Sequence, residues 1–164
     1  MKSEMRIDRH KTSILYLLFV FLLLSCDPNQ VFEQNTNFKD LTWHKDSIVT
    51  IKVDIVDTTS AHNIYINVRN TSRYEMQNLF LFVNTTSPNG TVLRDTFECY
   101  LADDRGKWTG SGWGDIYENQ FLYKKNVRFP ISGNYTFKYT QAMRTNELKN
   151  ISDIGLRIEK VEFR

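Results

Sequence analysis

The sequence predicts an all-β protein, an antiparallel β-sandwich of about seven strands preceded by a short apolar leader. Three observations support this fold class. Apolar and polar residues alternate with a period of two in most segments after residue 43. Clusters of Gly, Pro, Asn and Ser separate these segments at short intervals. Beyond the leader no segment shows the apolar period of a helix, and aromatic residues, which favour strands, make up 13% of the chain.

The leader contains an apolar run, Ile14–Leu24, that follows a basic head. The run is much shorter than the roughly 20 residues that a membrane-spanning helix needs, and it fits the apolar region of a secretory signal peptide. The sequence Leu23-Leu24-Ser25-Cys26 resembles a bacterial lipobox, in which cleavage before the cysteine exposes the residue that carries the lipid. The sequence therefore predicts a lipoprotein signal peptide over residues 1–25 and lipidation of Cys26. An ordinary signal peptide or an uncleaved anchor, with an incidental cysteine, is the alternative.

Two further regions follow the leader: the lipidated cysteine with its tether, over residues 26–42, and a β-sandwich domain over residues 43–164. The residues after the predicted lipidation site are polar and rich in Asn and Gln. A flexible coil of this length would span roughly 20–25 Å. The isolated apolar residues Val31, Phe32 and Phe38 indicate that part of the tether lies against the domain.

Four strands are predicted in the first half of the domain. Ser47–Asp57 and His62–Asn70 alternate strictly, which is typical of strands with one solvent-facing side. Gln77–Thr86 is apolar on both faces, as expected of a central strand or of one that the tether covers. The sequence Ser87-Pro88-Asn89-Gly90 is a strong turn signal, because Pro fixes φ and Asn-Gly tolerates positive φ. It predicts a hairpin between Gln77–Thr86 and Thr91–Ala102.

The second half of the domain is predicted to contain another hairpin and a crossover. Asn119–Pro130 and Asn134–Met143 are expected to pair around a Ser-Gly-Asn turn. Thr145–Asp153 is then expected to be a crossover, with one helical turn at Asn146–Lys149. The predicted crossover connects the second hairpin to the last predicted strand.

Ile154–Phe163 is the last predicted strand. Its apolar positions change from even to odd numbers along the segment. A β-bulge inserts one residue into a strand and so produces such a phase change. We therefore expect a bulge near Glu159-Lys160.

Charge excludes one class of partner. The whole chain has 21 basic and 19 acidic side chains, but removal of residues 1–25 leaves 17 of each. A chain without net basic charge has no electrostatic basis for binding nucleic acid. We expect its partners to be the membrane, through the lipid anchor, and envelope proteins, with no nucleic acid.

The cysteine and histidine content predicts no cofactor and no metal site. After lipidation of Cys26, Cys99 is the only remaining thiol, so no intramolecular disulfide can form. Phe97, Cys99 and Leu101 share one side of a strand, which predicts a buried, unreactive thiol. His44 and His62, the two histidines of the mature chain, do not lie at metal-ligand spacing from other ligands.

The loop Asp103–Glu118 is the most unusual stretch of the mature chain. It holds four of the seven glycines together with Arg105, Trp108, Trp113 and Tyr117. The glycines permit sharp bends, so the tryptophans could close one end of the sandwich as structural plugs. The same aromatic and Arg side chains are also the types that dominate protein docking sites, so a partner is expected to dock there.

Three other functions of this loop have weaker support in the sequence. A nucleotide site would need a GK[ST] sequence and a following helix, and neither is present. A calcium site could use Asp103, Asp104 and Asp115, but their spacing is not that of an EF-hand. Stacking of a sugar ring on the exposed aromatic residues remains the main alternative to protein docking.

No sequence pattern identifies an enzyme. The chain contains neither GxSxG nor HExxH. Glu98, Asp103, Asp104 and Asp115 could face one another across a cleft, but their spacing does not require it. We expect a protein without catalytic residues.

Several segments together resemble a known family. They are the lipobox, Trp43-His44-Lys45-Asp46, the block Gly112–Arg144 (GWGDIYENQFLYKKNVRFPISGNYTFKYTQAMR) and Ile154-Gly155-Leu156-Arg157. In these segments the chain is similar to the gliding-motility lipoprotein GldH family of Bacteroidota. The resemblance covers nearly all of the mature chain, and the Gly112–Arg144 block is its most specific part.

The resemblance implies a non-enzymatic cell-envelope lipoprotein that supports gliding, or the secretion machinery tied to gliding, as an assembly or scaffold component. It implies no catalytic residues. The segment after the cysteine contains only Asp27 and Glu33 as acidic residues, fewer than an acidic surface-export signal would have. We therefore expect an outer-membrane, periplasm-facing lipoprotein. The alternative is a glycan-binding β-sandwich module of the envelope.

Overall fold

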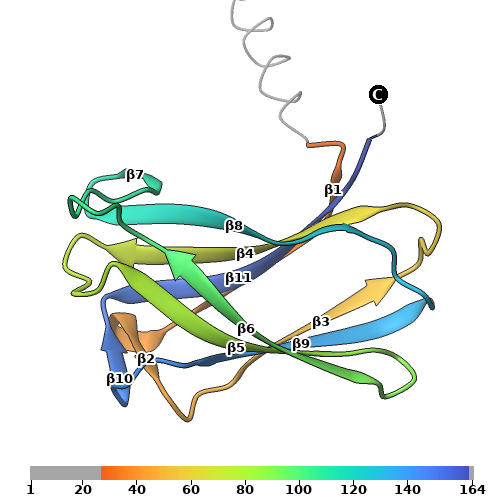
Figure 1. Cartoon of the computed structure of the whole chain (residues 1–164), viewed down its shortest axis with the longest axis horizontal. Coiled ribbons are helices and arrows are strands. Elements are labelled where there is room, and N and C mark those ends of the chain that lie inside the picture. Colours follow the sequence, from red (N-terminus) through yellow and green to blue (C-terminus); the bar gives the residue numbers. More distant parts are fainter. Residues whose placement is uncertain (1–26, 163–164) are drawn as a thin grey trace, which may run out of the picture.

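Two antiparallel β-sheets pack face to face in the computed structural model of the chain, which describes residues 27–162 (Figure 1). The predicted leader and Cys26 lie outside the described residues. The five-stranded sheet has the order β1-β11-β4-β8-β7, with bounds β1 Gln30–Asn37, β11 Ile151–Lys160, β4 His62–Thr71, β8 Ile116–Val127 and β7 Ser111–Trp113. The four-stranded sheet has the order β3-β9-β5-β6, with bounds β3 Val49–Ile55, β9 Gly133–Gln141, β5 Asn78–Thr86 and β6 Val92–Tyr100.

The period-two alternation places the apolar side chains between these two sheets, and the prediction of an antiparallel all-β fold is confirmed. In β3, for example, the burial pattern alternates strictly between buried and exposed residues. The largest fully buried side chains come from both sheets, from β2 and from the residue directly after β6: Trp43, Ile51, Ile66, Leu79, Leu81, Leu101, Phe137, Tyr139, Ile151, Ile154, Leu156 and Ile158.

The first predicted hairpin is confirmed. β5 and β6 pair in register from Asn78↔Tyr100 to Thr86↔Val92. The turn between them holds Gly90 at φ +86°, and the Gly90 amide donates to the carbonyl of Ser87 at 2.9 Å. Only a residue without a side-chain penalty at positive φ closes such a turn without strain.

The second predicted hairpin is wrong. β8 pairs with β4 and β7 in the five-stranded sheet, whereas β9 pairs with β3 and β5 in the four-stranded sheet. The chain therefore crosses from one sheet to the other after Val127. Phe129 is 3% exposed, and the Tyr135 hydroxyl donates to the Ile131 carbonyl at 3.0 Å, so both hold the crossing segment. A turn signal shows where a strand ends, but it does not show which strand is the next neighbour.

The predicted helical turn at residues 146–149 is also wrong. Residues Glu147–Lys149 form β10, which pairs with β2 (Thr42–His44). Leu148 lies opposite Trp43, and both side chains are buried. Trp43 stacks on Phe38 at a ring distance of 4.8 Å, and its indole N–H donates to the Ser47 carbonyl at 2.9 Å. Burial of this tryptophan outweighs the local preference for a helical turn.

The predicted β-bulge lies at the other end of the last strand. The pairing of β11 with β4 shifts between Ile151 and Asp153, so Ser152 is the extra residue. From Asp153 to Lys160 the register with β4 is regular, and the strand ends there. A second irregularity lies in β1 between Gln30 and Phe32, opposite the predicted position in the partner strand.

The segment predicted as a tether is largely a strand of the sandwich. Gln30–Asn37 forms β1 and pairs with β11 along its length. A three-residue 3-10 helix, Lys39–Leu41, then leads into β2. No helix within residues 27–162 is long and apolar enough to cross a membrane. The polar composition misled the prediction, because β1 is an edge strand whose outer face is in water.

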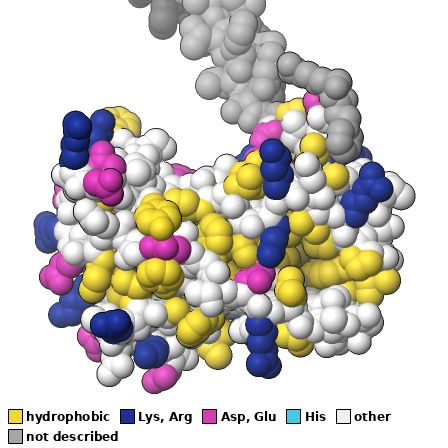
Figure 2. Space-filling view, in the orientation of Figure 1, with side chains coloured by type: hydrophobic (Ala, Val, Ile, Leu, Met, Phe, Trp, Pro, Cys, Tyr) yellow, Lys and Arg dark blue, Asp and Glu magenta, His cyan; other side chains and the backbone are white. Residues whose placement is uncertain are grey.

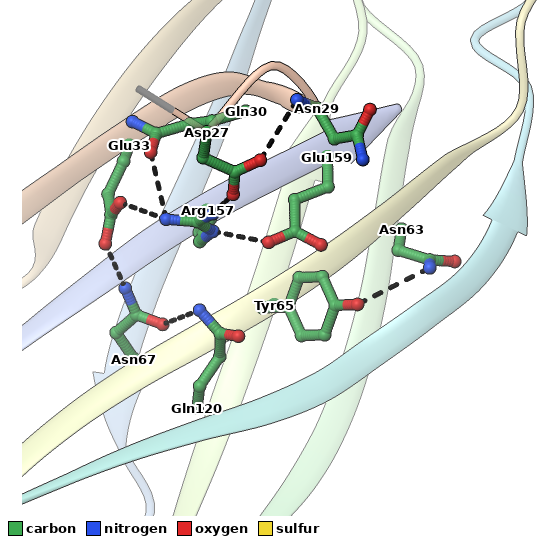
Figure 3. Close-up of polar contacts among 10 residues, drawn as sticks. All are labelled: Asp27, Asn29, Gln30, Glu33, Asn63, Tyr65, Asn67, Gln120, Arg157 and Glu159. Carbon is green, nitrogen blue, oxygen red and sulfur yellow. Dashed lines mark hydrogen bonds and ion pairs between the residues drawn. The ribbon is translucent and has the colours of Figure 1, made fainter. Parts of the chain in front are cut away.

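Arg157 of β11 fastens this N-terminal segment to the sheet (Figure 3). Its Nε donates to Glu159 at 2.6 Å, one Nη donates to Glu33 at 2.7 Å and to Gln30 at 2.9 Å, and the other Nη bonds to Asp27. The Arg157 side chain is 15% exposed. One guanidinium thus bonds to three carboxylates, two of which belong to the segment that follows Cys26.

The polar network continues across the outer face of the five-stranded sheet. The Asn67 amide in β4 donates to Glu33 at 2.9 Å, and the Gln120 amide in β8 donates to Asn67 at 3.3 Å (Figure 3). Gly155 in β11 lies beneath β1, where a Cβ would overlap the Asn35 side chain and lie 2.8 Å from the Gln34 carbonyl oxygen. The absence of a side chain at residue 155 therefore leaves room for the Asn35 side chain of its partner strand.

The first prediction concerns the thiol. Cys99 is fully buried, and burial raises the pKa of its thiol. A thiol reagent should therefore react with Cys99 only after the protein is unfolded. Substitution Cys99→Ser should lower the free energy of unfolding by about 1–3 kcal/mol, because it buries a hydroxyl without an assured partner. Rapid labelling of the native protein would show that Cys99 faces solvent.

The second prediction concerns Arg157. Substitution Arg157→Ala should lower the free energy of unfolding by about 2 kcal/mol, because it leaves neighbouring carboxylates without their cation. Amide hydrogen exchange in β1 should accelerate more than exchange in β5. Arg94, an exposed arginine for which the described residues provide no ion pair, is the matched control: Arg94→Ala should change neither measurement. Equal effects of the two substitutions would contradict the assigned role of Arg157.

Candidate functional site

The two ends of the sandwich differ in what they carry. Asn29 accepts a hydrogen bond from the Lys160 amide at 2.9 Å, and strand register places His62 beside Lys160 and Val127 beside His62. We call this end the leader end. The predicted docking loop lies at the opposite end, between the end of β6 and the start of β8, and we call it the loop end (Figure 1).

Asp103 organises the first half of the loop. Its Oδ1 accepts the backbone N–H groups of Arg105 at 2.9 Å and Lys107 at 2.8 Å. Gly106 takes φ +76° at the turn between them. A bridge then pairs Ala102 with Trp108. The Asp103 carboxylate therefore serves as a turn cap.

The second half of the loop is a tight hairpin. β7 pairs with the start of β8, and Gly114 turns the chain at φ +71° between Trp113 and Ile116. The Asp115 carbonyl accepts the Ser72 amide at 2.8 Å, and its carboxylate accepts the Ser72 hydroxyl at 3.2 Å. The hairpin is thus fastened to the connection between β4 and β5.

Two of the four predicted site residues pack inward. Trp108 is half-buried against the core, and its ring lies 5.7 Å from that of Tyr117 with an interplanar angle of 33°. The neighbouring Thr109 hydroxyl bonds to the Leu101 carbonyl and the Asn119 side chain, both at 3.0 Å. This arrangement fits the interpretation of Trp108 as a structural plug.

The other two predicted residues face solvent. Trp113 is 98% exposed, and Arg105 is also exposed. Within residues 27–162 the Trp113 ring makes no close aromatic pair. The structure therefore does not combine the three aromatic side chains into one flat platform. It presents a single indole at the tip of a short hairpin.

Two acidic residues of the loop have structural partners. Asp103 caps a turn, and Asp115 holds Ser72. Within residues 27–162 no group of three His, Cys, Asp or Glu side chains lies close enough together to hold a metal ion. The arrangement suits recognition through one apolar ring better than coordination of a cation.

The sequence pattern did not identify two groups that the structure brings out. Arg157 and two of its carboxylates, Asp27 and Glu33, come from segments more than 120 residues apart, so their spacing carries no signal. Trp43 was placed at the start of the domain, but its isolated position did not predict that it is fully buried. Both lie in segments that resemble the GldH family.

Comparison with known proteins agrees with that resemblance. The family model described as GldH lipoprotein matches residues 30–158. The chain is 38% identical over 153 residues to a protein named gliding motility lipoprotein GldH homolog from Christiangramia forsetii, covering 89% of this chain and 93% of the relative. It is 36% identical over 159 residues to gliding motility lipoprotein GldH from Flavobacterium johnsoniae, covering 93% and 98% of the two chains. Because the match spans most of all three chains, this chain belongs to the GldH lipoprotein family.

Proposed function

We propose that this protein is a non-enzymatic, periplasm-facing lipoprotein of the outer membrane that supports gliding motility, or the associated secretion machinery, as an assembly or scaffold component. One observation carries the scaffold role. Trp113, the most exposed large hydrophobic residue within residues 27–162, lies at the end of the sandwich opposite the segment that joins the predicted lipidation site. The indole therefore lies at the end far from the membrane to which a lipid on Cys26 would anchor the protein.

The connection between lipid and domain is short. Only Asp27 and Pro28 separate Cys26 from Asn29, whose carbonyl is already bonded to β11, and these three residue steps reach at most about 10 Å. The 12 residues of β8 then span roughly 35–40 Å toward the loop end. A lipid on Cys26 would hold the leader end close to the bilayer and present Trp113 well into the periplasm.

An isolated, fully exposed tryptophan is a good candidate for a docking residue. Tryptophan and arginine are enriched among the few residues that carry most of the energy of a protein interface. Trp113 and Arg105 lie in the same loop, and both are exposed. Pairing of β7 with β8 holds the backbone at Trp113 in place, so a partner that covers this residue has to order only its side chain.

The acidic residues near Cys26 support the proposed location. Asp27 and Glu33 both bond to Arg157 and are held against the sheet. An export signal must be accessible to the machinery that reads it. These two carboxylates instead have a structural role, which supports a periplasm-facing rather than a surface-exposed protein.

Glycan binding remains the second candidate function. The exposure of Trp113 favours it, because an indole face can stack on a sugar ring. The inward packing of Trp108 and the tilt between Trp108 and Tyr117 speak against a platform of several rings. Protein docking therefore has the stronger support.

The third prediction tests the docking residue. Substitution Trp113→Ala should impair gliding or secretion while the lipoprotein accumulates at its normal level, because an exposed side chain contributes little to folding. Trp113→Phe should retain part of the function. Val56, which is 81% exposed at the leader end, is the matched control, and Val56→Ala should have no effect. Impairment that follows only from loss of the protein would contradict the proposal, and polysaccharide affinity abolished by Trp113→Ala would favour glycan binding.

The fourth prediction tests the anchor. Substitution Cys26→Ala should release a folded domain from washed membranes, or leave an uncleaved chain held by its leader. Several acyl chains at about 0.8 kcal/mol per buried CH₂ bind far more strongly than one chain does. Fractionation combined with the mass of the N-terminal peptide distinguishes these products. Mature Cys26→Ala protein that still sediments with the membrane would disprove lipidation as the anchor.

A further inference from the structure

An apolar pocket of about 300 Å³ opens between the two sheets, on the side where β6 and β8 approach each other. Figure 2 shows hydrophobic side chains gathered around a hollow on the right-hand part of this side. The floor consists of core residues: Ile64, Phe129 and Tyr135 are each 3% exposed, and Phe137 is fully buried. Leu93 lies at the mouth and is 53% exposed. The pocket thus has core side chains for its floor.

The polar contacts of Asp95 border the pocket. Its carboxylate accepts the Tyr123 hydroxyl at 2.5 Å and pairs with Lys124 at 2.8 Å, which ties β6 to β8. The pocket walls also include Ser87, Thr91 and Arg128, which lie in or beside the loops of the leader end. The pocket therefore lies toward the end of the molecule that the proposed anchor holds near the bilayer.

Strand register gives the distance to the anchor. Asn29 lies next to β11, β11 lies next to β4, and β4 lies next to Val127 of β8. Asn29 and Val127 are therefore three strand spacings apart across the sheet, or roughly 15 Å. Val127 itself lines the pocket. The pocket wall therefore lies within the length of one acyl chain from the segment that joins Cys26.

The size and charge of the pocket favour a lipid. If each carbon needs about the 30 Å³ that a water molecule occupies, the pocket holds roughly ten carbons, which is a long segment of an acyl chain. Arg128 and Lys124 stand at the pocket, and Lys125 follows. Asp95 neutralises Lys124, whereas the described residues include no ion-pair partner for Arg128. A cation beside an apolar cavity is suited to an anionic headgroup on an apolar chain.

We propose that this pocket takes one acyl chain of an anionic phospholipid from the bilayer that holds the protein. The inference rests on the proposed anchorage through Cys26, because only an anchored domain keeps the pocket at the membrane. A captured chain fixes the rotation of the sandwich about its anchor. The loop end, with Trp113, then points in one direction.

The experiment uses the complete mature protein, which begins at the lipidated Cys26, in vesicles of phosphatidylcholine and phosphatidylglycerol. A small fraction of the phosphatidylglycerol carries a diazirine near the end of one acyl chain. After irradiation, mass spectrometry locates the labelled peptides. We expect label in β6 and in residues 123–130. Because the probe is on the phospholipid, occupation of the pocket by the protein's own lipid would leave these peptides unlabelled and would overturn the proposal.

Two leucines provide a matched pair of variants. Leu93 lies at the pocket mouth, whereas Leu122, which is 43% exposed, lies on the neighbouring strand β8 and does not line the pocket. Leu93→Asp should reduce the label in the pocket peptides to background, and Leu122→Asp should leave it unchanged. Leu93→Gln, a milder change, should also lower it. Protection of the Cys99 thiol shows that each variant is folded, and equal labelling of the two aspartate variants would overturn the proposal.

The headgroup contribution is tested separately. Arg128→Gln should lower labelling by a diazirine probe on phosphatidylglycerol but leave labelling by the matching phosphatidylcholine probe unchanged. An equal decrease with both probes would contradict the preference for an anionic lipid. The mass of the N-terminal peptide reports on anchorage independently. An anchored protein with an unlabelled pocket disproves only the pocket proposal, whereas a chain without lipid disproves the proposed anchorage.

Discussion

The pairing of β1 with β11, held by Arg157, is the interaction on which the arrangement of this molecule depends. Asp27, Glu33 and Glu159 would repel one another on one face of the sheet without the guanidinium between them. Arg157 can bond to all of them because its planar group offers five donors in a fixed geometry. Without this contact β11 would become the edge of the five-stranded sheet. The apolar residues of β11 would then lose the neighbouring strand β1 that shields them from solvent at this edge of the sheet.

This pairing also converts a chain segment that could have been a flexible tether into part of the domain. A tether of about 16 residues would let the sandwich turn freely above the membrane. With β1 in the sheet, only a few residues separate Cys26 from a rigid body. With the proposed lipid on Cys26, one end of the sandwich would lie near the bilayer and the other would be remote from it. This difference between the two ends matters for both proposed sites. The docking loop lies at the loop end, and the lipid pocket lies toward the leader end.

The loop end shows how two residues of one type come to differ in environment. Trp108 pairs with Ala102 beside the core, so its ring is half-buried next to Tyr117. Trp113 lies on β7, a three-residue edge strand with no neighbour on its outer side in the described sheet, so its ring remains in water. From composition alone, the same degree of burial would be expected for both tryptophans. Their separation results from two short turns, one capped by Asp103 and the other made possible by Gly114.

Apolar patterning and turn signals in the sequence by themselves determined the fold class, the four strands in the first half of the domain and the burial of Cys99, because these properties depend on neighbours along the chain. The sheet to which β8 and β9 belong, the strand at residues 147–149 and the role of β1 were decided only by tertiary structure. The physical reason is that strand partners are chosen by contacts between distant segments, such as Leu148 with Trp43 and Glu33 with Arg157. No local pattern encodes those contacts. The same holds for the candidate site, where sequence located the loop and only the fold separated Trp113 from Trp108.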